Sequence, residues 1–283
     1  FRRQLLDSVN SLHVAHPQDI ESQMGPVAQK PEEKLLRGLT TLGPGERWLI
    51  QPKELDETGR LWSPGVREGV KPGSEYHMTE YFGPILGIMT ADTLEEAIEL
   101  QNAPDYGLTA GLHSLDADDL ELWLSKVQAG NVYVNRGITG AIVRRQPFGG
   151  WKKSTVGSGT KAGGPNYLVA LTDWEPDHAT ATTVPQSVAV REVLATAEGA
   201  SLCGAKDFEF IKRSASSDAH AWETEFGYGH DPSKLGVERN ILRYLPTQVL
   251  VRADESAPAA EVVRVVLAGL AAGAPIALST ARD

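Results

Sequence analysis

The chain has 283 residues, of which 41% are hydrophobic and 23% are charged, as is usual for a globular protein. Its 27 Lys and Arg residues against 37 Asp and Glu residues leave a net charge of −10, which disfavours binding to nucleic-acid phosphates. No apolar run approaches the ~20 residues that cross a bilayer, so we expect no membrane insertion. Because Cys203 is the one cysteine, an internal disulfide is excluded and a reducing, cytoplasmic location is expected.

The first quarter of the chain predicts two helices and two strands. Apolar residues at helical spacing predict a helix over residues 1–12, and because no cap residue precedes it we expect the natural polypeptide to extend upstream. A second helix is predicted to follow Met24-Gly25-Pro26 and to run to about residue 41. Strand-like segments occupy residues 47–51 and 83–90.

The next segment continues this alternation of strands and helices. Thr93 and Glu96 form a capping-box pattern that opens a helix, and a strand is predicted over residues 108–114. Asp116 is expected to cap another helix, which Gly130 ends as a C′ glycine before a strand over residues 131–135. The alternation predicts an α/β protein with a largely parallel sheet.

A glycine-rich segment over residues 136–165 follows without a sustained helical or strand period. A loop of this length inside a compact domain is usually either functional or disordered. Apolar residues such as Ile138, Phe148 and Trp151 are rare in disordered linkers, so we expect an ordered, functional loop.

The C-terminal part predicts a separate domain. A strand over residues 247–252, a helix over 259–272 and a strand over 275–279 have the size of a right-handed βαβ unit. A polar, Ala- and Thr-rich boundary precedes this part of the chain. We therefore predict a first domain over residues 1–172, a linker over 173–184 and a Rossmann-like domain over 185–283 whose end is truncated.

Glu80 and Phe82 stand immediately before a predicted apolar strand. A carboxylate at this position can accept both hydroxyls of a ribose, and an aromatic ring two residues later can lie against a planar ring. The alternative is a surface glutamate and a core phenylalanine at an ordinary turn, and the residues alone favour that alternative slightly.

Gly140, Ala141 and Phe148 form a second candidate site in the glycine-rich segment. Small residues at 140 and 141 let backbone N–H groups approach a carboxylate, and Phe148 can pack on an aliphatic ligand chain. A connecting loop with a core phenylalanine explains the same residues equally well.

Three other patterns are interpreted as structural. Gly157–Ala162 matches Gly-x-Gly-x-x-Ala but follows no hydrophobic strand, so we reject a dinucleotide loop there. Cys203 has no neighbouring His and is interpreted as an idle thiol. His13 and His16 have no evident third ligand, so no metal site is predicted.

Several motifs in order resemble the aldehyde dehydrogenase superfamily over residues 1–171. They are Glu80-x-Phe82-Gly83-Pro84, the Asn135 region and Pro147-Phe148-Gly149-Gly150. The longer strings at 137–143, 145–150 and 161–168 look like a glutamate-γ-semialdehyde (pyrroline-5-carboxylate) dehydrogenase, and more narrowly like the proline utilization A family, in which it is fused to proline dehydrogenase. The implied fold is the second half of an aldehyde dehydrogenase catalytic domain followed by a C-terminal Rossmann-like, degenerate dehydrogenase domain, for which residues 240–244 and the βαβ unit are the match.

The resemblance implies an NAD-dependent enzyme that forms L-glutamate in proline catabolism. It implies that Glu80 holds the nicotinamide ribose, that Phe82 lines the nicotinamide pocket, that Gly140 and Ala141 bind the substrate carboxylate, and that Phe148 flanks the substrate methylenes. The family's nucleophilic cysteine is expected upstream of residue 1, so this chain is expected to supply no catalytic residue and to be inactive alone.

The same resemblance sets expectations for cofactors and partners. FAD is expected only in an upstream proline dehydrogenase domain. The expected partners are a small-molecule substrate, the remainder of the same polypeptide and further copies in a homo-oligomer. Two alternatives stay open: an aldehyde dehydrogenase with another substrate, and a non-catalytic assembly module.

Overall fold

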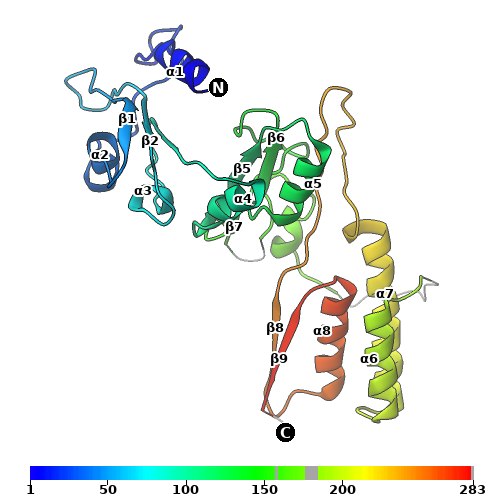
Figure 1. Cartoon of the computed structure of the whole chain (residues 1–283). Helices are drawn as coiled ribbons and strands as arrows, with labels where there is room; N and C mark the ends of the chain where they lie inside the picture. The colour runs from blue at the N-terminus through cyan, green and yellow to red at the C-terminus, as the bar shows by residue number, and fades with distance from the viewer. Residues whose placement is uncertain (157–158, 176–183, 282–283) are drawn as a thin grey trace. The chain divides into compact units, whose positions relative to one another are not determined.

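The computed structural model describes residues 1–156, 159–175 and 184–281. The chain forms two compact units (Figure 1). The first comprises residues 1–141 and 147–166, and the second comprises residues 142–146 and 167–283. The chain therefore joins the second unit briefly at 142–146, returns to the first, and then leaves it. Most of the predicted linker, residues 173–184, lies outside the described residues, so its position stays a prediction.

The N-terminal part of the first unit is a small three-stranded sheet with short helices. In chain order the elements are α1 (Arg2–Asn10), α2 (Glu33–Thr40), β1 (Arg47–Ile50), β2 (Gly65–Glu68), α3 (Glu75–Met78) and β3 (Ile85–Ile88). Strand β2 lies in the middle, antiparallel to β1 and parallel to β3, with Gly65 opposite Ile85. Val66 of β2 and Leu39 of α2 are fully buried, so the central strand and this helix share the core.

Helix α2 begins at Glu33, later than the predicted start just after Pro26, so that boundary was wrong. Pro31 disfavours a helical conformation at the residue before it, which delays the start to Glu33. Residue 27 belongs instead to an extended connection, where the Val27 amide donates to the Arg60 carbonyl at 3.0 Å.

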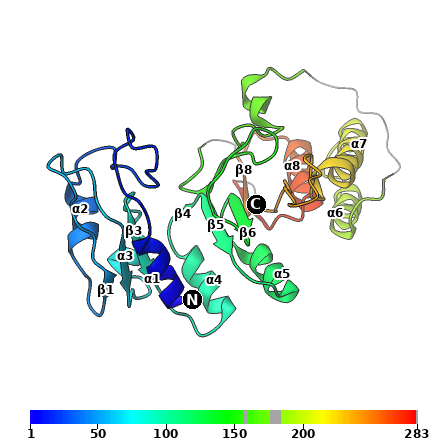
Figure 2. The same cartoon turned by 90° about the horizontal axis from the view of Figure 1, so that it is seen from above.

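The rest of the first unit packs two helices against parallel strands. Its elements are α4 (Leu94–Asn102), β4 (Tyr106–Gly107), β5 (Thr109–Leu112), α5 (Ala117–Lys126), β6 (Asn131–Val134) and β7 (Trp151–Lys152). Strands β5 and β6 are parallel, with α4 and α5 beside them (Figure 2). Strand β4 pairs with β7 antiparallel. A buried cluster around Ile98 and Trp123 joins the two helices to the strands. The predicted caps are confirmed, since Thr93 accepts from the Glu96 amide at 3.1 Å and Asp116 from the Asp118 amide at 2.9 Å.

Gly130 does not end α5 as a C′ glycine, so that prediction was wrong. The helix ends at Lys126, with Val127 as its cap. Gly130 precedes β6 and lies so close to the Gly149 carbonyl that any Cβ would overlap it. The glycine is therefore required by close backbone approach rather than by helix termination.

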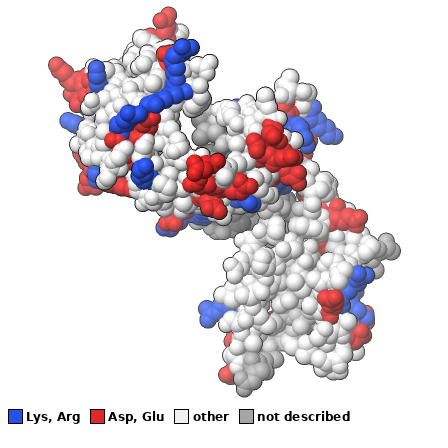
Figure 3. Space-filling model, viewed as in Figure 1, with Lys and Arg blue, Asp and Glu red and all other residues white. Residues whose placement is uncertain are grey.

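Helices α4 and α5 form an acidic part of the surface. Figure 3 shows acidic side chains gathered over the part of the surface where these helices lie. The exposed carboxylates on and beside the two helices include those of Asp92, Glu95, Glu99, Asp116, Asp118 and Glu121. This distribution agrees with the net charge of −10 and gives this surface a negative potential.

The second unit consists of helices packed on a two-stranded sheet (Figure 1). Its elements are a 3-10 turn η1 (Tyr167–Leu171), α6 (Val188–Gly199), α7 (Ala205–Ala221), a π-helical turn η2 (Trp222–Phe226), β8 (Val249–Ala253), α8 (Ala259–Ala271) and β9 (Ile276–Thr280). Strands β8 and β9 are parallel and joined through α8, which confirms the strand–helix–strand order of the predicted βαβ unit. Val190, Ile211 and Leu267 bury the contacts among α6, α7 and α8.

The α/β prediction is confirmed for the described residues. Their strands form four small sheets, in which β2–β3, β5–β6 and β8–β9 are parallel pairs. Among the helices of these residues, none combines the length and apolar character needed to span a bilayer.

Candidate active site

The turn between α3 and β3 presents Glu80 and Phe82 to solvent. Phe82 is 83% exposed and has a φ of 59°, in the left-handed region that non-glycine residues adopt only at a cost. An exposed aromatic ring on a strained backbone is unusual in a structural turn, and such strain concentrates at functional sites. The Glu80 carboxylate makes no hydrogen bond or ion pair with any residue that the structure describes, so its oxygens are available to a ligand.

A buried arginine supports this turn through two stacked tyrosine rings. Arg67 on β2 is 2% exposed and pairs with Glu46 Oε2 at 2.7 Å. Its guanidinium lies 4.0 Å from the ring centre of Tyr76, which stacks on Tyr81 with ring centres 5.0 Å apart. Burial raises the pKa of Tyr76 to about 12. The stack thus fixes Tyr81, the buried residue between Glu80 and Phe82, while its two neighbours face outward.

Gly83 completes the turn. A Cβ at this position would overlap the end of the Leu35 side chain on α2, so a larger residue would require that side chain to shift. The Ile85 amide donates to the Gly83 carbonyl at 2.8 Å, which closes the turn as β3 begins. In the turn, the candidate side chains of Glu80 and Phe82 are exposed, and Tyr81 between them is buried.

The second candidate segment follows β6. Gly140 has a φ of 127°, which favours glycine, and its carbonyl accepts a 2.6 Å hydrogen bond from the Tyr133 hydroxyl. Gly140 and Ala141 are both exposed, and within residues 1–156, 159–175 and 184–281 neither amide donates a hydrogen bond. Two adjacent, unpaired N–H groups on an exposed loop are suited to an anionic oxygen.

Phe148 lies further along, paired in a short antiparallel bridge with Ala162. Its amide donates to the Ala162 carbonyl at 3.0 Å, and the Ala162 amide donates back at 2.9 Å. Its side chain is half-buried. The glycine-rich segment is thus ordered at Phe148, as expected from its apolar residues.

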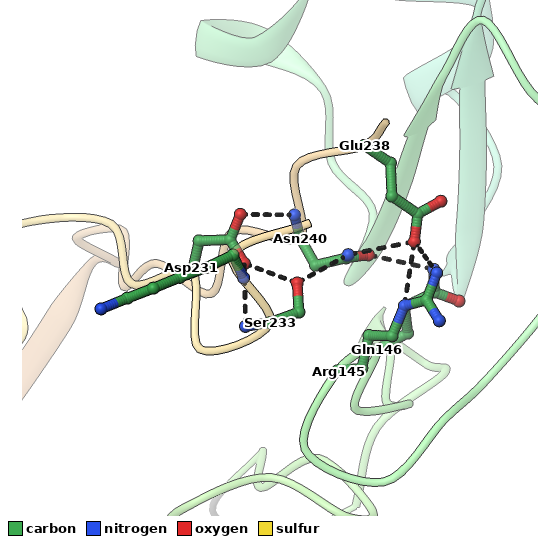
Figure 4. Close-up of polar contacts among 7 residues, drawn as sticks. Arg145, Gln146, Asp231, Ser233, Glu238 and Asn240 are labelled. Carbon is green, nitrogen blue, oxygen red and sulfur yellow. Dashed lines mark hydrogen bonds and ion pairs between the residues drawn. The ribbon is translucent and has the colours of Figure 1, made fainter. Parts of the chain in front are cut away.

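Residues 142–146, between the two substrate candidates, belong to the second unit, where Arg145 and Gln146 bond to Glu238 and Asn240 (Figure 4). The Ile142 amide donates to the Gln146 carbonyl at 3.1 Å, and the Gln146 amide donates to the Ile142 carbonyl at 2.7 Å. Arg145 Nε donates to Glu238 Oε1 at 2.9 Å, and Gln146 Nε2 donates to Asn240 Oδ1 at 3.0 Å. The segment therefore bonds to itself through its backbone and is held by the side chains of Arg145, which also donates to Glu238 from Nη2, and of Gln146.

Glu238 and Asn240 are themselves ordered by a neighbouring turn, as Figure 4 shows. Asn240 Nδ2 donates to Glu238 Oε1 at 3.1 Å and to Ser233 Oγ at 3.0 Å. Asp231 accepts from the Ser233 hydroxyl at 2.7 Å and from the Asn240 amide at 3.2 Å. Sequence reasoning missed this network because Glu238 and Asn240 lie more than ninety positions from Arg145 and Gln146, and the string at 240–244 was the one signal that pointed to the region.

A cavity shared by the 80–82 turn and the 140–148 segment remains a prediction. A cavity of about 290 Å³ in the first unit is lined by residues such as His77, Thr90 and Gln101, and none of the predicted site residues lines it. A second cavity, of about 310 Å³, belongs to the second unit, around Trp222 and Tyr244. The roles of Glu80 and Phe82 and of the 140–148 segment likewise remain predictions.

The patterns interpreted as structural are placed elsewhere. Cys203 is partly buried against the hydrophobic cluster of α6, α7 and α8. His13 pairs with Asp19 at 2.7 Å, whereas His16 pairs with Asp56 at 2.8 Å, so the two rings have separate partners. Gly157 and Ser158 lie outside the described residues. In the part of the chain that the structure describes, no three His, Cys, Asp or Glu side chains are grouped to hold a metal ion.

Comparison with known proteins gives one family and two kinds of relative. The family model described as "Aldehyde dehydrogenase family" matches residues 1–175. The chain is 35% identical over 166 residues to a 1-pyrroline-5-carboxylate dehydrogenase of Geobacillus sp. (strain WCH70), covering 58% of this chain and 32% of that protein. It is 34% identical over 160 residues to the protein of the same name in Bacillus subtilis (strain 168), covering 56% of this chain and 31% of the relative. The chain thus spans about a third of the length of these curated relatives.

Two solved structures extend the comparison. Proline Utilization A (PutA) from Corynebacterium freiburgense is 45% identical with a TM-score of 0.88, covering 100% of this chain and 28% of that one. A 1-pyrroline-5-carboxylate dehydrogenase from Thermus with bound NAD is 34% identical with a TM-score of 0.51, covering 59% of this chain and 32% of that one. The match to the Corynebacterium protein covers the whole chain and so includes the second unit, whereas the match to the Thermus enzyme covers 59% of the chain.

Proposed function

The chain belongs to the aldehyde dehydrogenase family, and from this premise we propose that it forms part of an NAD-dependent L-glutamate γ-semialdehyde (pyrroline-5-carboxylate) dehydrogenase. The names of its relatives and its 45% identity to a proline utilization A protein support this substrate and its place in proline catabolism. We further propose that the protein works in the cytoplasm as an oligomer, with the rest of a bifunctional polypeptide.

One observation in the structure supports the substrate class most directly. The adjacent amides of Gly140 and Ala141 are exposed and donate no hydrogen bond within the described residues. L-Glutamate γ-semialdehyde carries a carboxylate at the end opposite its aldehyde, and two backbone N–H groups can bind that carboxylate without a cationic side chain. A simple aliphatic aldehyde has no group for these amides.

The residues of the α3–β3 turn fit a dinucleotide. The Glu80 carboxylate can accept hydrogen bonds from two ribose hydroxyls, because its oxygens have no partner among the described residues. Phe82 offers an exposed ring face beside it. When NAD is bound, it supplies the acceptor for the aldehyde hydride. In this proposal the two residues hold and orient the nicotinamide end rather than react.

This chain's contribution is therefore binding and orientation. Gly140 and Ala141 fix the carboxylate end of the substrate, and Phe148 flanks its methylene groups. Fixing the carboxylate end and the methylene groups of a flexible substrate lowers the entropy lost on reaching the reactive geometry. Cys203 is not assigned as the nucleophile, because it packs in the hydrophobic cluster of the second unit.

The proposal is tested by removing one amide. Ala141→Pro deletes the N–H group, whereas Ala141→Ser keeps it. In the full-length protein with NAD, we expect Ala141→Pro to raise the KM for L-glutamate γ-semialdehyde about tenfold, as loss of a hydrogen bond to a charged group implies. Ala141→Ser should stay within about twofold of wild type, and propanal oxidation should respond to neither change.

Two outcomes would contradict the proposal. Equal kcat/KM for propanal and the semialdehyde in wild type would indicate an aldehyde dehydrogenase of another specificity. No NADH formation with either aldehyde would favour a non-catalytic assembly module.

A further inference from the structure

Lys161 occupies an unusual position in the first unit. Its ammonium donates to the carbonyl oxygens of Gly130 at 2.5 Å and Gly149 at 2.6 Å, and lies 3.4 Å from Asn131 Oδ1. It makes no ion pair with a described carboxylate. Burial of the side chain without a counter-charge lowers its pKa to about 8. Burying a cation against backbone carbonyls costs free energy that an apolar side chain would not, which suggests that this lysine has a specific structural role.

Asn131, the first residue of β6, contacts the same peptide segment from the strand side. Its side chain is buried, with 9% of the residue exposed. Its Nδ2 donates to the Pro147 carbonyl at 2.9 Å, and its Oδ1 accepts from the Gly149 amide at 3.0 Å. One amide side chain thus binds the backbone on both sides of Phe148.

Two backbone features complete this arrangement. Phe148 is paired with Ala162, the residue that follows Lys161, through two hydrogen bonds. Gly130 allows the Gly149 carbonyl to approach β6 so closely that a Cβ would overlap it. The backbone of residues 147–149 is therefore held from β6 on one side and from residues 161 and 162 on the other.

We propose that Asn131 and Lys161 are positioning residues that hold Phe148 in place as the wall against the substrate methylenes. This inference rests on the proposed semialdehyde dehydrogenase function. Neither side chain touches the substrate; they act through the backbone of Pro147 and Gly149, the residues on either side of Phe148. Displacing the ring weakens binding of a substrate with an aliphatic chain while the NAD-binding turn, which shares none of these bonds, is unaffected.

The chain offers a matched control for the test. Lys152 on β7 also donates from its ammonium to two backbone carbonyls, those of Asn102 and of Pro104, the latter at 3.0 Å. Lys152→Met and Lys161→Met therefore each remove a lysine that bonds to main-chain oxygens in the same unit. Only the carbonyls bound by Lys161 include one, that of Gly149, in the segment that carries Phe148.

In the full-length protein we expect Lys161→Met to raise the KM for L-glutamate γ-semialdehyde about tenfold while the KM for NAD stays within about twofold. Lys161→Arg, which keeps the donors, should recover at least part of the loss. Hydrogen exchange at the Phe148 and Gly149 amides should accelerate in Lys161→Met and not in Lys152→Met. Lys152→Met should leave the semialdehyde KM unchanged.

The outcomes separate this inference from the proposed function. If wild type oxidises the semialdehyde and Lys161→Met behaves like Lys152→Met, the positioning role is wrong although the function stands. If wild type does not oxidise the semialdehyde, the proposed function is wrong and the exchange measurement decides whether Lys161 orders Phe148. Unchanged exchange in Lys161→Met overturns the inference in either case.

Discussion

The hydroxyl of Tyr133 donates a 2.6 Å hydrogen bond to the carbonyl oxygen of Gly140. Tyr133 is a buried residue of β6, and Gly140 is the first of the two residues whose amides are free for a carboxylate. The bond fixes the carbonyl of the peptide group that joins Gly140 to Ala141. The same planar group carries the Ala141 N–H, which points away from the carbonyl oxygen. A core strand thus sets the direction in which a backbone donor points.

Removing this hydroxyl should weaken the substrate anchor. Tyr133→Phe keeps the ring and loses the bond, whose net contribution of about 1 kcal/mol corresponds to roughly a fivefold increase in the KM for L-glutamate γ-semialdehyde. Steady-state kinetics with NAD at saturation measures the change. Tyr106→Phe, at an exposed position on β4, is the control. An unchanged KM in Tyr133→Phe would show that the Gly140 peptide needs no support from the strand.

The strained backbone at Phe82 predicts that two variants will weaken NAD binding alike but differ in stability. Phe82→Ala and Phe82→Gly both lose the ring, so both should raise the KM for NAD. Only glycine relieves the left-handed conformation, and we expect Phe82→Gly to be more stable than Phe82→Ala by about 1 kcal/mol. Urea unfolding of the two variants gives this difference. Equal stabilities would mean that the φ of 59° carries no strain.

The pair between Arg145 and Glu238 should affect the substrate anchor from the second unit. Glu238→Gln weakens the bond that holds residues 142–146, which directly follow Ala141, and we expect the semialdehyde KM to rise about threefold. The reversed pair Arg145→Glu with Glu238→Arg should restore part of that loss. Asp218→Asn disrupts the Arg264–Asp218 pair, whose Nη1–Oδ2 distance is 2.6 Å, in the same unit and serves as the control. A rise of the same size in Asp218→Asn would indicate a general effect of the unit's stability.

Lys161 predicts a pH dependence of stability. Burial lowers its pKa to about 8 in the folded chain, whereas a free lysine titrates near 10.4. Between these values the unfolded chain binds more protons at this residue than the folded one, so its contribution makes the free energy of unfolding rise with pH. The neutral amine keeps two N–H groups for the carbonyls of Gly130 and Gly149.

Urea unfolding between pH 7.5 and 10 tests this assignment. We expect the increase with pH to be smaller in Lys161→Met than in wild type, while Lys152→Met should follow the wild-type profile. Parallel profiles for wild type and Lys161→Met would show that the lysine retains its ordinary pKa in the folded protein.

Local signals explain which parts of the fold were predictable. The caps at Thr93 and Asp116, the strand at 131–134 and the β8–α8–β9 unit each depend on residues close together in sequence, and the structure has all of them. The start of α2 and the role of Gly130 were predicted wrongly. The first error came from overlooking Pro31, and the second from judging Gly130 by its distance from a helix rather than by its contact with Gly149.

The family could be recognised from the residues alone, because the motifs at 80–84, 137–143 and 145–150 occur in order with side chains whose chemistry depends little on surroundings. The contacts that support those motifs became visible only in the folded chain. The bonds of Asn131 and Lys161 around Phe148 and the bond from Arg145 to Glu238 join residues that are 12 to 93 positions apart in the chain. Hydrogen bonds and ring stacking act over a few ångströms in space, whatever the distance along the chain, so a pattern of neighbouring residues contains no signal for them.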